Sequence, residues 1–416
     1  MVLSSINIPA VVFLKELSGL LRKYYDLRVT IITSARVPLV KLYSEGIAVD
    51  IVFASTALPT PPTTEQLLCD NFLLYVSIES RPSVNGIRTV LEIKQSLPVD
   101  YDVYVTTLKA VKRWAMKRLV YGNLFTFPNG VTLAIMVCYI CQTFPHNSPS
   151  FLFRYFFSYF AEFLPSHVFP SIPIFITLSL QQKKIRIDGI PRCWSSNRAS
   201  CKEEIFPVLN PAYPYVNAAH SVGRCGLQYF YDEIVRAQQL LFLHPKRIPM
   251  DQIWEPYSIC KNFRQFVAIH VSCIAMVEED CESALNIWKG LIESKLRFFV
   301  YAIERTVDVR PFPKVFSSSS KLDDSQNGAH LRKCVYFFAV KPRESVESSK
   351  LHSLSLVSHD FVASCFAELI FAVREGINPS PGGQLPYQPQ IMVDPSFSLH
   401  CVSDDNFVNE FGDHLK

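Results

Sequence analysis

Alternating apolar and polar positions predict a β-hairpin over Arg36–Ala54, where two apolar, β-branched runs flank the turn-prone triplet Ser44–Glu45–Gly46. In the second run Ile47, Val49, Ile51 and Phe53 share one face, and Ala48, Asp50 and Val52 share the other. Both faces are otherwise apolar, so the pattern predicts a central strand that carries a lone, buried carboxylate, Asp50. Because burial of an unpaired carboxylate is costly, we expect a cation or hydrogen-bond donors beside Asp50, in a structural ion pair or in a functional site.

Helical spacing of apolar residues precedes this hairpin over Val11–Tyr25, and a strand is predicted over Leu27–Ile32. The order helix–strand–strand–strand indicates an α+β fragment that is too small to close a sheet of its own. The proline- and threonine-rich stretch Pro59–Thr64 then marks a domain boundary.

From Glu65 to about His244 the pattern is mostly helical, and it is clearest over Val103–Val120. Five cations lie outside the apolar stripe of that helix: Lys109, Lys112, Arg113, Lys117 and Arg118. Such a row forms either a solvated face or a site for a triphosphate or an RNA backbone. The loop Thr126–Val131 leads into a buried helix over Thr132–Cys141, whose N-terminus exposes backbone N–H groups to an anion or a nucleotide.

Beyond Met250 strands and helices alternate, which predicts a small α/β sandwich. The predicted elements are a strand over Phe266–Val277, a helix over Cys281–Leu296, strands over Phe298–Glu304 and Cys334–Val340, and a helix over Asp360–Arg374. Two stretches, Ser317–Asn327 and Pro379–Pro389, have the composition of exposed loops.

The composition, 49% hydrophobic and 19% charged, indicates folded domains rather than global disorder. A net charge of +4 does not by itself indicate a polyanionic partner. Several of the 12 cysteines lie in apolar runs (Cys138, Cys273 and Cys365), and we expect them to be reduced core residues, with the Cys138–Cys141 pair structural rather than metal-binding. Charges and prolines interrupt Phe151–Leu180, so we expect a buried helix there and no membrane partner.

Several short segments occur in an order and spacing that one family shares. They are Val37–Leu42 with Gly46–Ala54, Ser83–Arg88, Thr107–Ala115 with Val120–Asn123, Gly130–Val131, Asn210–Pro214 and Trp288–Arg297. With these segments in register, the sequence resembles eukaryotic poly(A) polymerase of the nucleotidyltransferase superfamily. The resemblance implies a multidomain α+β chain with part of the catalytic palm domain at 1–57, a central helical domain at 58–249 and an RRM-like RNA-binding α/β sandwich at 250–416.

The activity that this resemblance implies is template-independent transfer of AMP from ATP to an RNA 3′-hydroxyl, as in mRNA 3′-end polyadenylation. Two divalent cations, Mg²⁺ or Mn²⁺, hold the attacking and leaving oxygens in such a reaction. The implied partners are an RNA 3′ end, ATP and 3′-end processing factors. A nuclear location rests on the resemblance alone.

The resemblance also assigns nucleotide-binding roles. Asn85 matches the group that hydrogen-bonds the ATP ribose, and Lys112 and Tyr121 match the triphosphate contacts. Val131, next to Gly130, matches the apolar plate against the adenine, although plain packing is the alternative for Tyr121 and Val131. Asn210 stands where the family commonly has a threonine near the base.

Asp50 matches the third metal-binding carboxylate of the family, a catalytic residue on the nucleophile side. The other two form an Asp-x-Asp motif that is expected upstream of Val11; Asp100 and Asp102 have the right spacing but directly precede the basic helix. With Asp50 alone we expect an incomplete two-metal site and little activity from this chain by itself, as an incomplete form of an active polymerase. The alternatives are a non-catalytic RNA-binding pseudoenzyme of the same family and a uridylyl or other nucleotidyltransferase.

Overall fold

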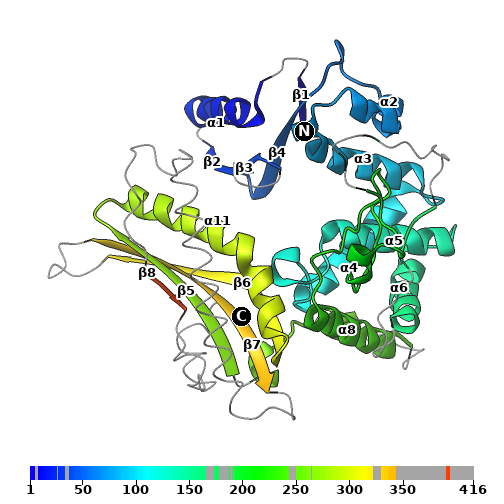
Figure 1. Ribbon diagram of the computed structural model, residues 1–416. Helices are drawn as coiled ribbons and strands as arrows, with labels where there is room; N and C mark the ends of the chain where they lie inside the picture. The colour runs from blue at the N-terminus through cyan, green and yellow to red at the C-terminus, as the bar shows by residue number, and fades with distance from the viewer. Residues whose placement is uncertain are drawn as a thin grey trace. The chain divides into compact units, whose positions relative to one another are not determined.

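The structure is a computed structural model (Figure 1). It divides into two compact units, each built from three stretches of the chain. Unit 1 comprises Met1–Leu108, Ala134–Leu152 and Ser171–Ala218, and unit 2 comprises Lys109–Leu133, Phe153–Pro170 and Ala219–Lys416. The structure describes residues 1–4, 8–25, 27–32, 37–164, 173–177, 187, 190, 192–242, 250–263, 265–321, 329–342 and 390–393.

Unit 1 contains a four-stranded sheet in the order β1-β4-β3-β2, in which only the β1–β4 pair is parallel. Its strands are β1 (Val2–Ser4), β2 (Arg28–Ile32), β3 (Leu39–Ser44) and β4 (Ile47–Ser55). Helix α1 (Ala10–Tyr25) packs on one face, where Leu14, Val40 and Phe53 are buried. The predicted hairpin is confirmed, and Glu45 and Gly46 take positive φ angles at its turn. Strand β1 was not predicted, because its three residues are too few to show a period.

The remaining elements of unit 1 follow the predicted boundary at Pro59–Thr64. Thr63 caps α2 (Thr64–Leu68) in a capping box with Gln66, and the 3₁₀ helices η1 (Asp70–Leu74) and η2 (Ile78–Ser80) lead into α3 (Arg81–Gln95). Arg88 of α3 forms a buried ion pair with Asp70 and donates a hydrogen bond to the carbonyl oxygen of Tyr213. One buried guanidinium thereby joins α3 to η1 and to the segment that carries Tyr213.

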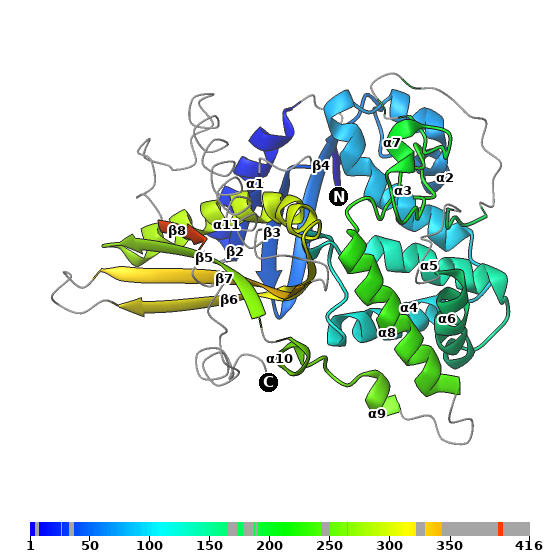
Figure 2. The ribbon, with the colours of Figure 1, turned by 60° about the horizontal axis from the view of Figure 1, so that its bottom comes forward.

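Beyond α3, the described part of the predicted helical region contains the long helices α4 (Tyr101–Lys117), α5 (Gly130–Thr143), α6 (Pro149–Phe163) and α8 (Arg224–Phe242). The short helices η3 (Asn123–Phe125) and α7 (Ala199–Lys202) lie between them in sequence. In unit 2, α4, α6 and α8 lie side by side (Figure 2), because the buried ring of Trp114 contacts Phe157 at 4.8 Å and Phe230 at 5.8 Å between ring centroids.

The C-terminal half of unit 2 is an antiparallel sheet in the order β6-β7-β5-β8, with α11 against it (Figure 1). Two short helices, α9 (Met250–Ile253) and α10 (Ile259–Asn262), precede it. Its elements are β5 (Gln265–Ala275), α11 (Glu278–Ile303), β6 (Val307–Lys321), β7 (His330–Pro342) and β8 (Gln390–Val393). The predicted α+β class is confirmed.

Two predictions in this half are wrong. Residues Phe298–Ile303 continue α11 instead of forming a strand, because Leu296, Phe299, Val300 and Ile303 keep the buried stripe at helical spacing. Residues Ser317–Lys321 belong to β6 and pair with β7, although their composition indicated a loop. The predicted helix Asp360–Arg374 and the predicted loop Pro379–Pro389 lie outside the described residues.

The cysteines and the apolar helices agree with the sequence-based interpretation where they are described. Cys138 and Cys141 are free thiols in the interior of α5, and burial raises the pKa of Cys141 to about 12, as expected of packing residues. Cys273 is likewise buried, whereas Cys365 lies outside the described part of the chain. Within the described residues, no helix has the length and apolar character that a membrane span requires.

Candidate nucleotide-binding site

Three of the residues with an expected nucleotide role meet in unit 2 at the start of α5. A Cβ atom added to Gly130 would lie 2.8 Å from the hydroxyl oxygen of Tyr121 and 3.3 Å from the ammonium nitrogen of Lys112. A side chain at this position would have to displace the ends of both polar side chains. Lys112 comes from the last turns of α4 and Tyr121 from the segment that follows α4, so the sequence brings the three together through one helix–loop–helix connection.

The chemistry of this cluster suits an anion. Within the described residues no carboxylate pairs with Lys112, and its side chain is half-buried. Burial raises the pKa of the Tyr121 hydroxyl, so the group stays protonated near neutral pH and can donate a hydrogen bond. The ammonium group, the phenol and the N-terminal end of α5 all favour negative charge.

Asn129 fixes where α5 begins. Its side-chain oxygen accepts hydrogen bonds from the backbone N–H of Thr132 at 2.8 Å and from the Thr132 hydroxyl at 3.0 Å, which is the usual bonding of a helix N-cap. Val131, in the first turn, has an exposed fraction of 43%, so its apolar side chain is available to a ligand. The residue pattern indicated a plain loop at Asn129 and did not reveal this capping role, although asparagine directly before a helix is a recognisable signal.

Residues at the start of α8 pack against the loop that carries Tyr121. The carbonyl oxygen of Thr126 accepts a hydrogen bond from the N–H of Gly223, and a side chain at Gly226 would clash with that same carbonyl group. Glu304, at the end of α11, accepts hydrogen bonds from the N–H groups of Arg224 and Cys225 at the start of α8. The loop is therefore positioned by close backbone packing that no sequence period reveals.

One of the five cations expected on a solvated or ligand-binding face of α4 is instead structural. Arg118 is 6% exposed and forms a two-bond ion pair with Glu233 of α8, to which Arg310 of β6 also donates. Lys109, Arg113 and Lys117 are exposed, as predicted. The expectation for Arg118 is wrong because this residue follows the last helical residue, Lys117, where the backbone turns the side chain inward.

Unit 1 holds the other two candidate groups, and Asn85 on α3 is the better supported of them. The side-chain oxygen of Asn85 is buried and has no hydrogen-bond partner among the described residues. A buried acceptor without a partner is costly, so this atom suits a donor supplied by a ligand, such as a ribose hydroxyl.

Asp50 does not lie where the pattern predicts. It is exposed on β4, opposite Lys41 of β3 in the sheet register, and the two side chains form no ion pair. Strand β1 pairs with β4 only at Phe53–Ser55, and α1 covers the opposite face, so within the described residues nothing buries Asp50. The predicted burial is therefore wrong, because the first four residues of β4, Ile47–Asp50, are all exposed.

Asn210 has a structural role. Its side-chain oxygen accepts hydrogen bonds from the Thr89 hydroxyl at 2.9 Å and from the N–H of Ala212 at 2.9 Å, and the residue is 7% exposed. These bonds tie the loop before Tyr213 to α3. Asp102, the other acidic candidate, lies in the first turn of α4, where a carboxylate stabilises the helix dipole.

Comparison with known families identifies three matching domain models. Residues 11–97 match the poly(A) polymerase nucleotidyltransferase domain, residues 103–256 the poly(A) polymerase central domain, and residues 261–361 the poly(A) polymerase predicted RNA binding domain. Together these matches cover most of the chain, in the order that the sequence resemblance implies.

Curated relatives point to the same family. The chain is 29% identical to poly(A) polymerase of Dictyostelium discoideum over 74% of its own length and 36% of the relative. It is 28% identical to poly(A) polymerase PAPalpha of Candida albicans (75% and 54% covered) and 27% identical to nuclear poly(A) polymerase 1 of Arabidopsis thaliana (77% and 42% covered). The chain thus spans between about a third and about half of the length of these relatives.

Among solved structures, Cid1 in complex with the UTP analogue UMPNPP is 14% identical to this chain, with a TM-score of 0.40 over 61% of this chain and 78% of that one. The Cid1 poly(U) polymerase crystal structure gives a TM-score of 0.38, with 59% and 77% covered and 15% identity. The named curated relatives are polymerases, which does not favour the non-catalytic alternative.

Proposed function

Because this chain belongs to the eukaryotic poly(A) polymerase family, we propose that it binds ATP for the transfer of AMP to an RNA 3′-hydroxyl. Lys112 and Tyr121 contact the triphosphate at the start of α5, and Val131 packs against the base. In unit 1, Asn85 accepts a hydrogen bond from the ribose. The RNA 3′ end is the second substrate, and the proposed setting is mRNA 3′-end formation in the nucleus, with 3′-end processing factors as partners.

The observation that carries this proposal is the meeting of Lys112, Tyr121 and Gly130. These residues are separated in sequence and have roles that the resemblance alone assigned, yet the fold places the first two within contact distance of a side chain at the third. A cluster that had only a packing role would not require an ammonium group without a carboxylate partner among the described residues. The domain limits 1–57, 58–249 and 250–416 remain part of this proposal.

The described residues do not supply the set of ligands that a two-metal site requires. Mg²⁺ and Mn²⁺ prefer several oxygen ligands, and a two-metal site needs more than one carboxylate. Within the described residues no three His, Cys, Asp or Glu side chains gather in a metal-binding arrangement. Asp50 supplies one exposed carboxylate, for which we propose the role of metal ligand and catalytic residue.

Calorimetric titration of the full chain with ATP tests the proposal. We expect saturable binding, and we expect Lys112→Ala to weaken it by about tenfold to a hundredfold, because a hydrogen bond to a charged group contributes about 1.5–3 kcal/mol. Lys109→Ala, which removes an exposed cation from the same helix, is the matched control and should bind ATP as the unmodified chain does. Equal affinities of the unmodified chain and Lys112→Ala would refute the assigned triphosphate contact.

A further inference from the structure

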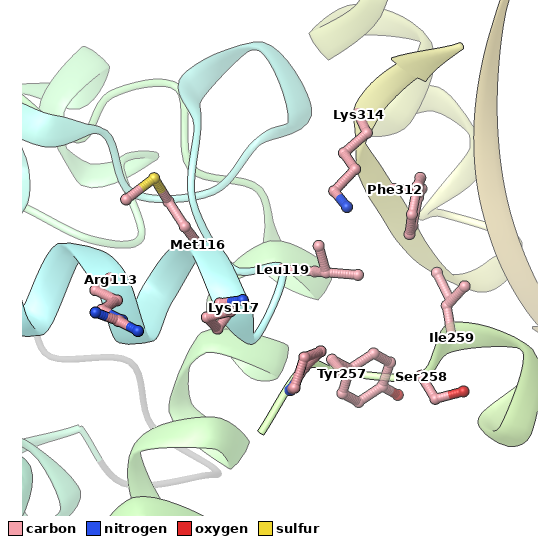
Figure 3. Close-up of a pocket in the computed structure, with 10 residues that line it drawn as sticks. Arg113, Met116, Lys117, Leu119, Tyr257, Ser258, Ile259, Phe312 and Lys314 are labelled. Carbon is pink, nitrogen blue, oxygen red and sulfur yellow. The ribbon is translucent and has the colours of Figure 1, made fainter. Parts of the chain in front are cut away.

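Unit 2 contains a cavity of about 450 Å³ that none of the proposed nucleotide contacts lines (Figure 3). Three segments enclose it: the last turns of α4, the loop before α10 and the start of β6. In Figure 3 the side chain of Lys314 extends from β6 beside Phe312, and Tyr257 and Ile259 lie across from it. The cavity lies within one compact unit, so its walls belong to one packed body.

The rim of this cavity carries positive charges that no carboxylate among the described residues neutralises. Arg113, Lys117 and Lys314 line it, all three are exposed, and no carboxylate among the described residues forms an ion pair with any of them. None of the described residues that line the cavity is acidic. Three like charges around one opening favour an anionic ligand.

The interior of the cavity is apolar. Leu119, Ile259 and Phe312 are at most 6% exposed, and Met116 remains 51% exposed above them. An exposed methionine beside aliphatic walls adapts to the shape of an apolar group that enters. A ligand that fits must therefore combine an apolar part with negative charges around it.

The aromatic rings at this cavity are poorly placed to stack on a nucleobase. The ring of Tyr257 already has the guanidinium groups of Arg118 at 5.2 Å and Arg310 at 3.5 Å from its centroid. The ring of Phe312 stacks on Phe316, with an interplanar angle of 11°. Recognition of a single-stranded base depends on a free aromatic face and on hydrogen bonds to the base edges, whereas both aromatic rings in this lining already contact other side chains.

The walls are also fixed before any ligand binds. The N–H of Tyr257 donates to the carbonyl oxygen of Lys117 at 2.9 Å, and Arg118 donates to the carbonyl oxygen of Glu255 at 2.7 Å. These bonds hold the loop before α10 against the end of α4. A preformed site loses little entropy of its own on binding, so the ordering cost falls mainly on the ligand.

From this combination we propose that the cavity binds a short acidic peptide segment of a partner protein, with one aliphatic side chain inserted among Leu119, Ile259 and Phe312. Carboxylates on either side of that anchor pair with Arg113, Lys117 and Lys314. This binding is independent of the proposed adenylyl transfer, so it can be correct whether or not the chain proves to be a polymerase.

Fluorescence anisotropy with two labelled peptides tests this proposal on the full chain. The probe is a fluorescein-labelled peptide with one leucine between acidic triplets, EDELEDE, and its matched control is EDESEDE. We expect the leucine peptide to bind about tenfold or more tightly than the serine peptide, because burial of one leucine side chain has roughly that effect. Equal affinities would show attraction to surface charge alone and would overturn the proposal.

Charge reversal on the rim gives the second test. The double variant Arg113→Glu with Lys314→Glu should weaken binding of the leucine peptide by about tenfold or more, as expected for replacing attraction by repulsion at two contacts. Lys109→Glu, an exposed cation of α4 outside the cavity, should leave it unchanged. All substituted residues are exposed. Circular dichroism spectra and Tm measurements check that each variant folds.

A labelled oligo(A) probe separates a peptide site from an RNA site. We expect the double variant to bind oligo(A) as the unmodified chain does, or to lose far less affinity for oligo(A) than for the leucine peptide. Loss of oligo(A) binding with unchanged peptide binding would overturn the proposal and identify the cavity as an RNA contact. Unchanged binding of both probes would overturn it as well.

Discussion

The two regions that hold the candidate nucleotide and metal groups differ in how far the protein itself arranges them. In unit 2, Lys112 and Tyr121 lie against Gly130, and hydrogen bonds and close backbone contacts hold the loop that carries Tyr121. In unit 1, Asp50 lies exposed on a strand, without an ion pair within the described residues. Groups that are arranged before a ligand binds contribute more to binding than groups that must first be ordered. We therefore expect the unit 2 cluster to dominate ATP affinity.

The largest expected effect comes from breaking the buried ion pairs that join the end of α4 to α8 and β6 in unit 2. Glu233→Leu leaves Arg118 and Arg310 buried without their carboxylate, which should lower the free energy of unfolding by about 3–5 kcal/mol. Urea denaturation measures it. Glu282→Gln removes a carboxylate from the exposed ion pair with Arg332 and should cost no more than about 1 kcal/mol. Similar losses in both variants would mean that the buried ion pairs of Glu233 stabilise the fold no more than an exposed ion pair does.

Gly130→Ala directly tests the cluster formed by Lys112, Tyr121 and Gly130. The added methyl group displaces the ends of the Tyr121 and Lys112 side chains, so ATP affinity should fall by about tenfold, comparable to one lost hydrogen bond to a charged group. Calorimetry with ATP measures it. In the control, Gly290→Ala, the methyl group has no heavy atom within 4 Å, and ATP affinity should not change. Unchanged affinity in Gly130→Ala would argue against a phosphate at this helix start.

Asn85→Ala tests how much unit 1 contributes to ATP binding. The buried side-chain oxygen of Asn85 has no partner to lose among the described residues of the free protein, so stability should change little, whereas ATP affinity should fall by about twofold to tenfold for one neutral hydrogen bond. Titration with 2′,3′-dideoxy-ATP provides the control, because the variant and the unmodified chain should bind this analogue equally. A persistent difference with the dideoxy analogue would exclude the ribose contact.

The smallest effect is expected at Asp50. Because Asp50 is exposed and makes no ion pair within the described part of the chain, Asp50→Asn should change the free energy of unfolding by no more than about 0.5 kcal/mol. Denaturation in urea, with and without Mn²⁺, measures it. A large loss of stability without metal would show that the carboxylate has a structural partner after all, and would remove the contrast between the two regions.

Sequence periodicity predicted the elements whose apolar residues repeat over several turns or strands. The hairpin, α1, α4, α5 and the strands β5 and β7 all appear near their predicted limits, because local spacing alone decides which face of each element is apolar. The pattern was wrong at the end of α11 and in the serine-rich part of β6. There, packing against the sheet and pairing with β7 outweigh local composition.

The sequence by itself determined the family, through short segments in register, and thereby the choice of Asn85, Lys112, Tyr121, Gly130 and Val131 as candidates. Only the tertiary structure decided which of these lie together, that Arg118 is a buried ion-pair partner rather than a ligand-facing cation, and that Asp50 is exposed. The physical reason is that spacing along the chain fixes the direction of a side chain within its own element. Burial and contact depend on which other elements pack against it, and those come from distant parts of the chain.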